Sequence, residues 1–167
     1  MPTVSSSRAE VVTRTRPVVA GVGPVLAAAV LGNAFVSRES LAWFQDLRRP
    51  RIQLPLPAFY AVGAAYYLIM GVVSSRAAGR HDRRGYRRAL VVLAGNELWN
   101  IALFGRRSPR AGFLGLLAFL IPLGLLQLAV RADRTSTLAL GAYTTYVIVY
   151  DLPWSYQLWR LNPPRDR

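Results

Sequence analysis

Five long apolar runs, separated by short charged segments, make up most of the chain. They cover residues 17–36, 56–75, 89–104, 111–130 and 137–159. Most are close to the roughly 20 residues that an α-helix needs to cross about 30 Å of hydrocarbon, and the third is the shortest. Because a helix satisfies its own backbone hydrogen bonds in lipid, the pattern predicts an all-α membrane protein, a bundle of five transmembrane helices.

Two further segments lie at the ends of the chain. Residues 1–16 are rich in Ser, Thr and Arg, which predicts a disordered N-terminal tail. Residues 17–162 then form the five-helix transmembrane domain, and residues 163–167 form a short C-terminal tail. The first run continues beyond Ala27-Ala28-Ala29, which resembles a signal-peptide cleavage site, so we interpret the run as a retained span.

Composition and charge agree with a multi-pass membrane protein. The chain has 53% hydrophobic and 17% charged residues with a net charge of +13, and its 21 basic residues are all arginine. The arginines lie between the apolar runs, where we expect membrane lipids as partners and no nucleic acid. The arginine- and alanine-rich usage is typical of a GC-rich bacterium and favours a bacterial cell membrane. The absence of cysteine and the single histidine argue against a metal site.

The membrane orientation is not decided by charge. With five spans, eleven arginines lie on the side of the N-terminus and ten on the other side. The positive-inside rule needs a clear excess on one side. Orientation therefore stays open.

Two acidic residues, Glu97 and Asp151, lie inside the apolar runs. A charge at mid-membrane costs roughly 2.5–3.5 kcal/mol, so each carboxyl is expected to be protonated, paired or next to water. Asn96 and Asn100 are one helical turn apart and lie beside Glu97, while Asp151 precedes Pro153, which frees a backbone carbonyl. Two interpretations stay open: these polar groups bind a ligand, or they link helices.

Aromatic and small residues suggest how the helices pack. Several aromatic residues of the second and fifth runs stand out: Tyr60, Tyr66, Tyr67, Tyr143, Tyr146, Tyr150, Trp154 and Tyr156. Singly they are typical of a core or an interfacial belt, and together they could line a flat apolar pocket. The pairs Ala28/Gly32 and Ala61/Ala65 predict close helix packing, with a homodimer face as the alternative.

Motifs spread over the chain resemble one protein family. In order they are Trp43-Phe44, Leu47, Arg48-Arg49-Pro50, Pro55, Phe59, Tyr67, Met70-Gly71, Asn96, Trp99, Phe104-Gly105, Arg106-Arg107, Pro109 and Trp159-Arg160-Leu161-Asn162. Their order and spacing resemble the TspO/MBR family, the tryptophan-rich sensory proteins that include the mitochondrial translocator protein (peripheral benzodiazepine receptor). Gly63 and Val147 stand where the family has tryptophans associated with porphyrin contact, so the chain resembles a divergent member.

The resemblance implies a membrane protein that binds a hydrophobic ligand within its helix bundle for sensing, sequestration or transport. The ligand would be a tetrapyrrole such as porphyrin or haem, a sterol or another isoprenoid, and no cofactor is required. The expected ligand-binding residues are Phe59, Tyr67, Asn96, Glu97, Trp99, Asn100 and Asp151. The loop after the first helix would form a lid with Trp43, Phe44, Arg48, Arg49 and Pro50.

Two alternatives to a binding protein stay open. The first is an intramembrane enzyme in which Glu97 and Asp151 act as acid and base on an isoprenoid or a porphyrin. It requires both carboxyls to reach one cavity. The second is a structural subunit of a membrane complex, which would need no internal cavity.

Overall fold

A computed structural model describes residues 19–32, 34 and 36–163. The predicted N-terminal tail and most of the predicted C-terminal tail thus lie outside the described residues. The helices are an N-terminal helix (Val19–Gly32), α2 (Arg38–Asp46), α3 (Leu56–Gly79), α4 (Arg83–Asn100), α5 (Pro109–Ala129), α6 (Arg134–Tyr146) and α7 (Leu152–Leu161). The described part of the chain has no β-strand, and the predicted all-α class is confirmed.

Two π-helical segments extend the regular helices. Helix α4 continues into η1 (Ile101–Gly105), and η2 (Val147–Asp151) joins α6 to α7 without a break. The second segment ends two residues before Pro153, which lacks an N–H and whose ring would clash with a carbonyl one turn earlier. A wider π turn accommodates this, and such turns are frequent at functional sites. Asp151 is the last residue of η2.

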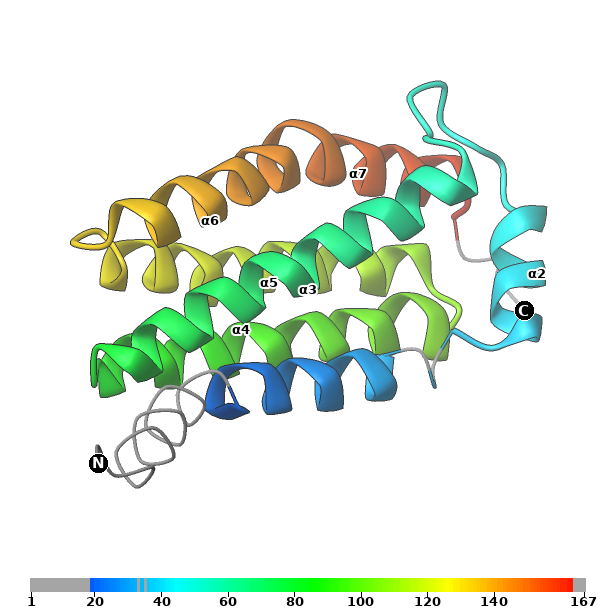
Figure 1. The fold of residues 1–167 in the computed structure, drawn as a ribbon. Helices are drawn as coiled ribbons and strands as arrows, with labels where there is room; N and C mark the ends of the chain where they lie inside the picture. The colour runs from blue at the N-terminus through cyan, green and yellow to red at the C-terminus, as the bar shows by residue number, and fades with distance from the viewer. Residues whose placement is uncertain (1–18, 33, 35, 164–167) are drawn as a thin grey trace, which may run out of the picture.

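The long helices lie side by side, and α2 crosses one end of the bundle (Figure 1). Helix α4 packs on α3 and α5, while α3 and α5 also contact the α6–η2–α7 rod. The N-terminal helix meets α3 at Gly21, next to Ser75, and meets α4 at Gly32, next to Glu97. Because a side chain at either glycine would collide with these neighbours, the glycines permit the close approach.

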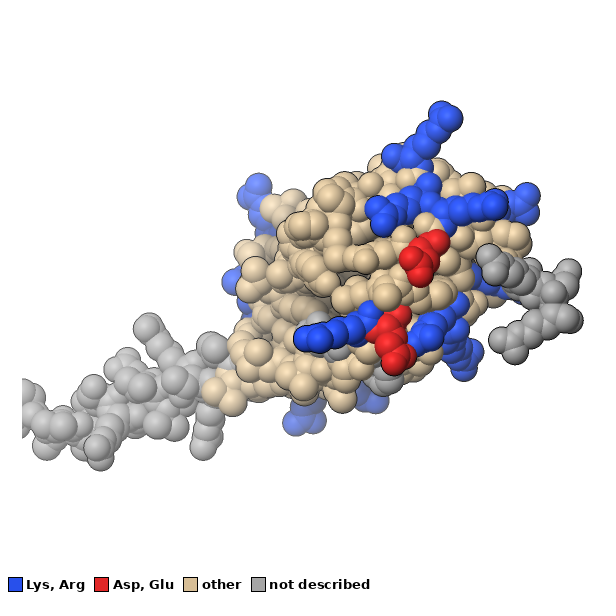
Figure 2. Space-filling model, turned by 90° about the vertical axis from the view of Figure 1, so that its right-hand side faces the viewer, with Lys and Arg blue, Asp and Glu red and all other residues tan. Residues whose placement is uncertain are grey.

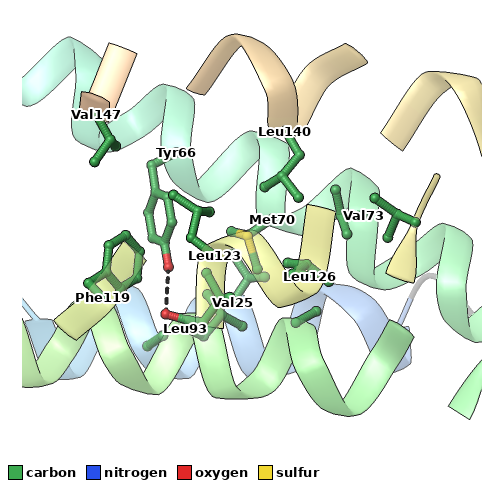
Figure 3. Packing of buried hydrophobic residues seen from close by; sticks show 14 of the residues in the cluster. Val25, Tyr66, Met70, Val73, Leu93, Phe119, Leu123, Leu126, Leu140 and Val147 are labelled. Carbon is green, nitrogen blue, oxygen red and sulfur yellow. Dashed lines mark hydrogen bonds between the residues drawn. The ribbon is translucent and has the colours of Figure 1, made fainter. Parts of the chain in front are cut away.

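The hydrophobic core lies between the N-terminal helix, α3, α4, α5 and the α6–η2 segment (Figure 3). Met70, Val92, Leu123 and Leu140 are fully buried in it. The Tyr66 hydroxyl donates a hydrogen bond to the Val92 carbonyl at 3.2 Å, which satisfies the buried phenol. A second cluster at the α2 end contains Phe44, Leu103, Trp154 and Leu158.

The outer surface of the helices is also apolar. Leu68 is 73% exposed, Ile121 67% and Val149 70%, on three different helical segments. Helices α3 and α5 are each long and apolar enough to cross a membrane. Arginine side chains surround the α2 end (Figure 2). A soluble protein normally avoids so large an apolar surface.

The segment between the first and second apolar runs is not simply a loop. It contains α2, whose first turn is capped by the Ser37 hydroxyl, which accepts a hydrogen bond from the Ser40 N–H at 3.1 Å. Because α2 is short and carries charged residues, it forms no apolar run in the sequence. Of the small-residue pairs, Ala28 and Gly32 are buried, whereas the α3 pair is exposed.

Candidate functional site

A cavity of about 390 Å³ lies between the N-terminal helix, α2, α3, α4–η1 and the α6–η2–α7 rod. Its lining residues are Ala29, Gly32, Val36, Leu41, Phe44, Leu56, Phe59, Tyr60, Val62, Gly63, Ala64, Tyr66, Tyr67, Asn96, Trp99, Asn100, Phe104, Tyr143, Tyr146, Asp151 and Trp154. The walls are apolar and aromatic, with amides and one carboxyl among them. This volume and composition are typical of a small-molecule site.

The structure brings the expected ligand-binding residues together. Those that line the cavity are Phe59, Tyr67, Asn96, Trp99, Asn100 and Asp151. Glu97 is set behind this wall, but it contacts three of the residues that form it. The helical spacing of Asn96 and Asn100 therefore placed both amides on the face that meets the cavity.

The Glu97 carboxylate is enclosed by neutral hydrogen-bond donors. Its Oε1 accepts from the Tyr67 hydroxyl at 3.0 Å and from Asn96 Nδ2 at 3.2 Å. Its Oε2 accepts from Asn100 Nδ2 at 3.3 Å. Glu97 is only 8% exposed, and no arginine pairs with it in the described part of the chain. Amides and a phenol thus replace the water that the carboxyl loses.

Gly32 completes the enclosure of Glu97. A Cβ at this position would collide with Glu97 Oε2 and would lie 2.9 Å from the Tyr67 hydroxyl oxygen. The N-terminal helix therefore approaches α4 at the point where the buried acid sits. The small-residue spacing in the sequence predicted close packing here, although not its partner.

Asp151 reaches the same cavity from η2. The neighbouring Tyr146 phenol interacts with its carboxyl electrostatically. The Tyr146 hydroxyl is buried and makes no well-formed hydrogen bond to any described residue. This side of the cavity thus combines a carboxyl with a neighbouring phenol, whereas both oxygens of Glu97 already accept hydrogen bonds.

Tyrosines connect the two acidic sides of the cavity. The ring centroids are 5.1 Å apart for Tyr67 and Tyr66, 5.0 Å for Tyr66 and Tyr143, and 6.4 Å for Tyr143 and Tyr146. Tyr67 bonds Glu97 at one end, and Tyr146 neighbours Asp151 at the other. Asp151 therefore lines the cavity and Glu97 lies behind the wall residues that it bonds, with tyrosines between the two carboxyls.

A cluster of aromatic residues closes the cavity at the α2 end. Phe59 lies 5.1 Å from Trp154 and 6.3 Å from Phe44 between ring centroids. Phe44 also lies 5.6 Å from Phe104. Phe44 is thus the expected lid residue that enters the cavity wall.

The other expected lid residues lie outside the cavity wall. Trp43 and Arg48 line a separate groove on the outer surface. Arg49 donates a hydrogen bond to the Gln45 carbonyl at 3.2 Å, and Pro50 is buried in the loop. These four residues shape the segment that carries Phe44 without contacting the cavity.

Two aromatic residues of the fifth run also lie elsewhere. The Tyr150 hydroxyl donates to the Ile52 carbonyl at 3.0 Å and accepts from the Leu54 N–H at 2.9 Å, so it anchors the loop. Tyr156 packs on Phe113 on the outer side of the bundle. Tyr146 and Tyr150 are one turn apart on the same rod, so sequence periodicity alone does not separate the loop anchor from the cavity-lining tyrosine.

Comparison with known protein families assigns the chain to one of them. The sequence pattern that defines the TspO/MBR family matches residues 20–159, and the chain belongs to this family. Membership supports a membrane protein with a sensory or transport role. A search of curated protein sequences gives no significant match.

Proposed function

We propose that this TspO/MBR protein is a five-span integral membrane protein that binds a planar hydrophobic ligand in its cavity, for sensing, sequestration or transport. The observation that carries the proposal is the 390 Å³ cavity, whose aromatic wall lies between the buried Glu97 and the partly buried Asp151. A purely structural subunit has no need of such a space. The bound ligand would be the signal or the cargo.

Membrane insertion is supported by the surface of the bundle. Apolar side chains are exposed along the helices, and arginines gather where the helices end. Both features are expected of a protein whose mid-section faces lipid and whose ends face head groups. The five long rods would each cross the bilayer once, and α2 would lie at one membrane surface.

The chemistry of the cavity favours a flat ligand with one polar end. Aromatic side chains stack on planar rings with an offset, which adds about 0.5–1.5 kcal/mol per pair beyond burial. A polar group of the ligand would reach Asn100 and Asp151, which line the wall. Tetrapyrroles, sterols and other isoprenoids combine a large apolar body with a few polar groups in this way.

Gly63 gives the cavity additional room. A Cβ placed on Gly63 meets no atom within 4 Å, so the wall is open at this point. Val147, in contrast, is fully buried and is not among the lining residues. The two positions that lack the family's tryptophans thus differ, and Gly63 is the one that would enlarge the ligand space.

The test is a titration of the purified protein in detergent with protoporphyrin IX and with a sterol, followed by tryptophan fluorescence. We expect Asp151→Asn and Glu97→Gln to weaken binding of at least one ligand about tenfold, equivalent to about 1.4 kcal/mol. The control is Glu39→Gln, which makes the same change on an 83% exposed side chain that does not line the cavity. Unchanged affinity in both cavity variants, for every ligand that binds the wild type, would contradict the site.

The same titration addresses the enzyme alternative. Both oxygens of Glu97 already accept hydrogen bonds, which suits a positioning role better than proton transfer. Time-dependent consumption of a bound ligand that stops in Glu97→Gln would nevertheless favour catalysis. Reversible binding without chemical change is the expected result.

A further inference from the structure

A second concave surface lies at the end of the bundle away from α2, between the start of α4 and the end of α5. It has a volume of about 450 Å³ and is lined by Arg84, Arg88, Leu125, Leu128, Ala129 and Arg131. A neighbouring hollow shares two of these arginines and adds Arg83, Arg87 and Val91. We call the first of these the α4–α5 groove; it is separate from the ligand cavity.

The positive charge of the α4–α5 groove is not neutralised within the described part of the chain. Asp133, the acid at the nearby α5–α6 turn, is already paired with Arg76 at 2.7 Å and Arg80 at 3.1 Å. Asp82 caps α4 by accepting from the Gly85 N–H at 2.9 Å. The groove arginines therefore keep a charge that an external anion can compensate.

Arg88 is held in position within this groove. Its Nη1 donates a hydrogen bond to the Leu125 carbonyl of α5 at 2.9 Å. One guanidinium N–H thus fixes the side chain between the two helices, and the other donors stay available for an anion. Arginine presents its donors in a planar fork that fits the oxygens of a phosphate group.

The lining changes from charged to apolar along both helices. On α4, Arg84 and Arg88 are followed one turn deeper by Val91, which lines the neighbouring hollow and is 55% exposed. On α5, Leu128 is 62% exposed and Leu125 45%, and both lie on the bundle side of Arg131. An amphiphile with an anionic head and an apolar chain matches this order. A free anion would contact only the arginines of the groove.

The groove at the opposite end has a different charge pattern. It is lined by Arg48, Arg107 and Arg110 but also by Asp46. Arg107 is further compensated by Glu39, with 2.8 Å between Nη2 and Oε2. Although both ends are rich in arginine, the α4–α5 groove is the one whose lining combines arginines with exposed leucines and no acid.

We propose that the α4–α5 groove binds one anionic phospholipid. Arg84, Arg88 and Arg131 would contact the phosphate, and an acyl chain would run along Leu125 and Leu128. The site rests on the proposed membrane location but is independent of the ligand cavity. Bound lipid would bridge α4 and the α5–α6 turn and fix this end of the bundle at the anionic face of the bilayer.

The test is native mass spectrometry of delipidated protein in neutral detergent, titrated with phosphatidylglycerol, phosphatidylcholine or inorganic phosphate. We expect one phosphatidylglycerol to bind at least tenfold more tightly than phosphatidylcholine, and Arg84→Gln/Arg88→Gln to abolish this preference. The matched control is Arg51→Gln/Arg106→Gln, which removes the same charge from exposed arginines at the other end. Circular dichroism checks that both variants keep their helices.

Each other outcome would overturn the proposal. Equal loss of the preference in the two double variants would mean that lipid responds only to net charge. Binding of inorganic phosphate as tightly as phosphatidylglycerol would indicate a simple anion site. Because no cavity ligand is added, a failure here leaves the proposed function untouched, and failure of the cavity titration leaves this lipid measurement interpretable.

Discussion

The side chain of Asn162 holds the backbone of Arg48, a residue 114 positions earlier in the chain. Its Oδ1 accepts from the Arg48 N–H at 2.9 Å, and its Nδ2 donates to the Arg48 carbonyl at 2.9 Å. The same Nδ2 donates to the Leu158 carbonyl, near the end of α7. The segment that carries Phe44 is thereby fastened to the last helix.

These three hydrogen bonds of Asn162 form a clamp, and its removal should loosen the α2 end of the cavity. Asn162→Ala deletes these three hydrogen bonds, and each contributes about 0.5–1.5 kcal/mol net. We expect a lower melting temperature and faster hydrogen exchange of the Arg48 amide, with little change in the core amides of α5. Asn162→Asp retains an acceptor for the Arg48 N–H and should give an intermediate effect. Exchange as slow as in the wild type for Asn162→Ala would show that the clamp is dispensable.

The clamp illustrates what the sequence could and could not provide. The resemblance to the family located both the Arg48-Arg49-Pro50 motif and the terminal Asn162. Spacing along the chain, however, carries no information on a contact between segments so far apart. That contact depends on where α7 ends relative to the loop, which is decided by the packing of whole helices.

The bond between Tyr67 and Glu97 should contribute measurably to stability. Tyr67→Phe removes the phenol that donates to Glu97 Oε1 and leaves a buried acceptor with one donor fewer. We expect a loss of about 1–3 kcal/mol in the free energy of unfolding. A double-mutant cycle with Glu97→Gln measures the coupling directly, and Tyr156→Phe, on the half-exposed outer side, is the matched control. Additive effects of the two cavity substitutions would argue against a direct interaction.

The ion pair at the α5–α6 turn should make stability depend on acid pH. The hydrogen bond from Arg76, aided by one from Ser136, lowers the pKa of the Asp133 carboxyl well below its usual range. Because the pKa of Asp133 is lower in the folded protein, the unfolded chain takes up the proton first as the pH falls. In the unfolded chain an aspartate titrates at about 3.9. The contribution of Asp133 is therefore present above that pH and is lost as the pH falls below it.

Thermal unfolding of wild type and Asp133→Asn between pH 7 and pH 2 measures this contribution. The wild type should melt at a higher temperature at neutral pH, and the difference should shrink as the solution becomes acidic. A difference that stays constant over the whole range would contradict the assignment. Asp46→Asn, an exposed aspartate without a described ion pair, is the control.

The positions of the long helices followed from apolar runs, but the cavity depended on finer features. The third run predicted a helix from residue 89, whereas α4 begins at Arg83 because arginines extend a helix beyond its apolar part. The π turn that ends at Asp151 has no simple hydrophobic signature, yet it brings this residue to the cavity wall. Asn96 and Asn100 were predictable because polar residues one turn apart on an apolar helix must share one face.

The central claim is that the cavity holds the ligand, and substitution at Gly63 tests it most directly. Gly63 lines the cavity, whereas Gly71 lies two turns further along α3 outside the lining, and neither has an atom within 4 Å of an added Cβ. Gly63→Leu and Gly71→Leu therefore gain the same helix propensity but differ in whether they fill the cavity. The measurement is saturation binding of protoporphyrin IX or sterol to both variants. We predict that Gly63→Leu weakens binding at least tenfold while Gly71→Leu binds like the wild type. Wild-type affinity in Gly63→Leu would contradict a ligand site in this cavity.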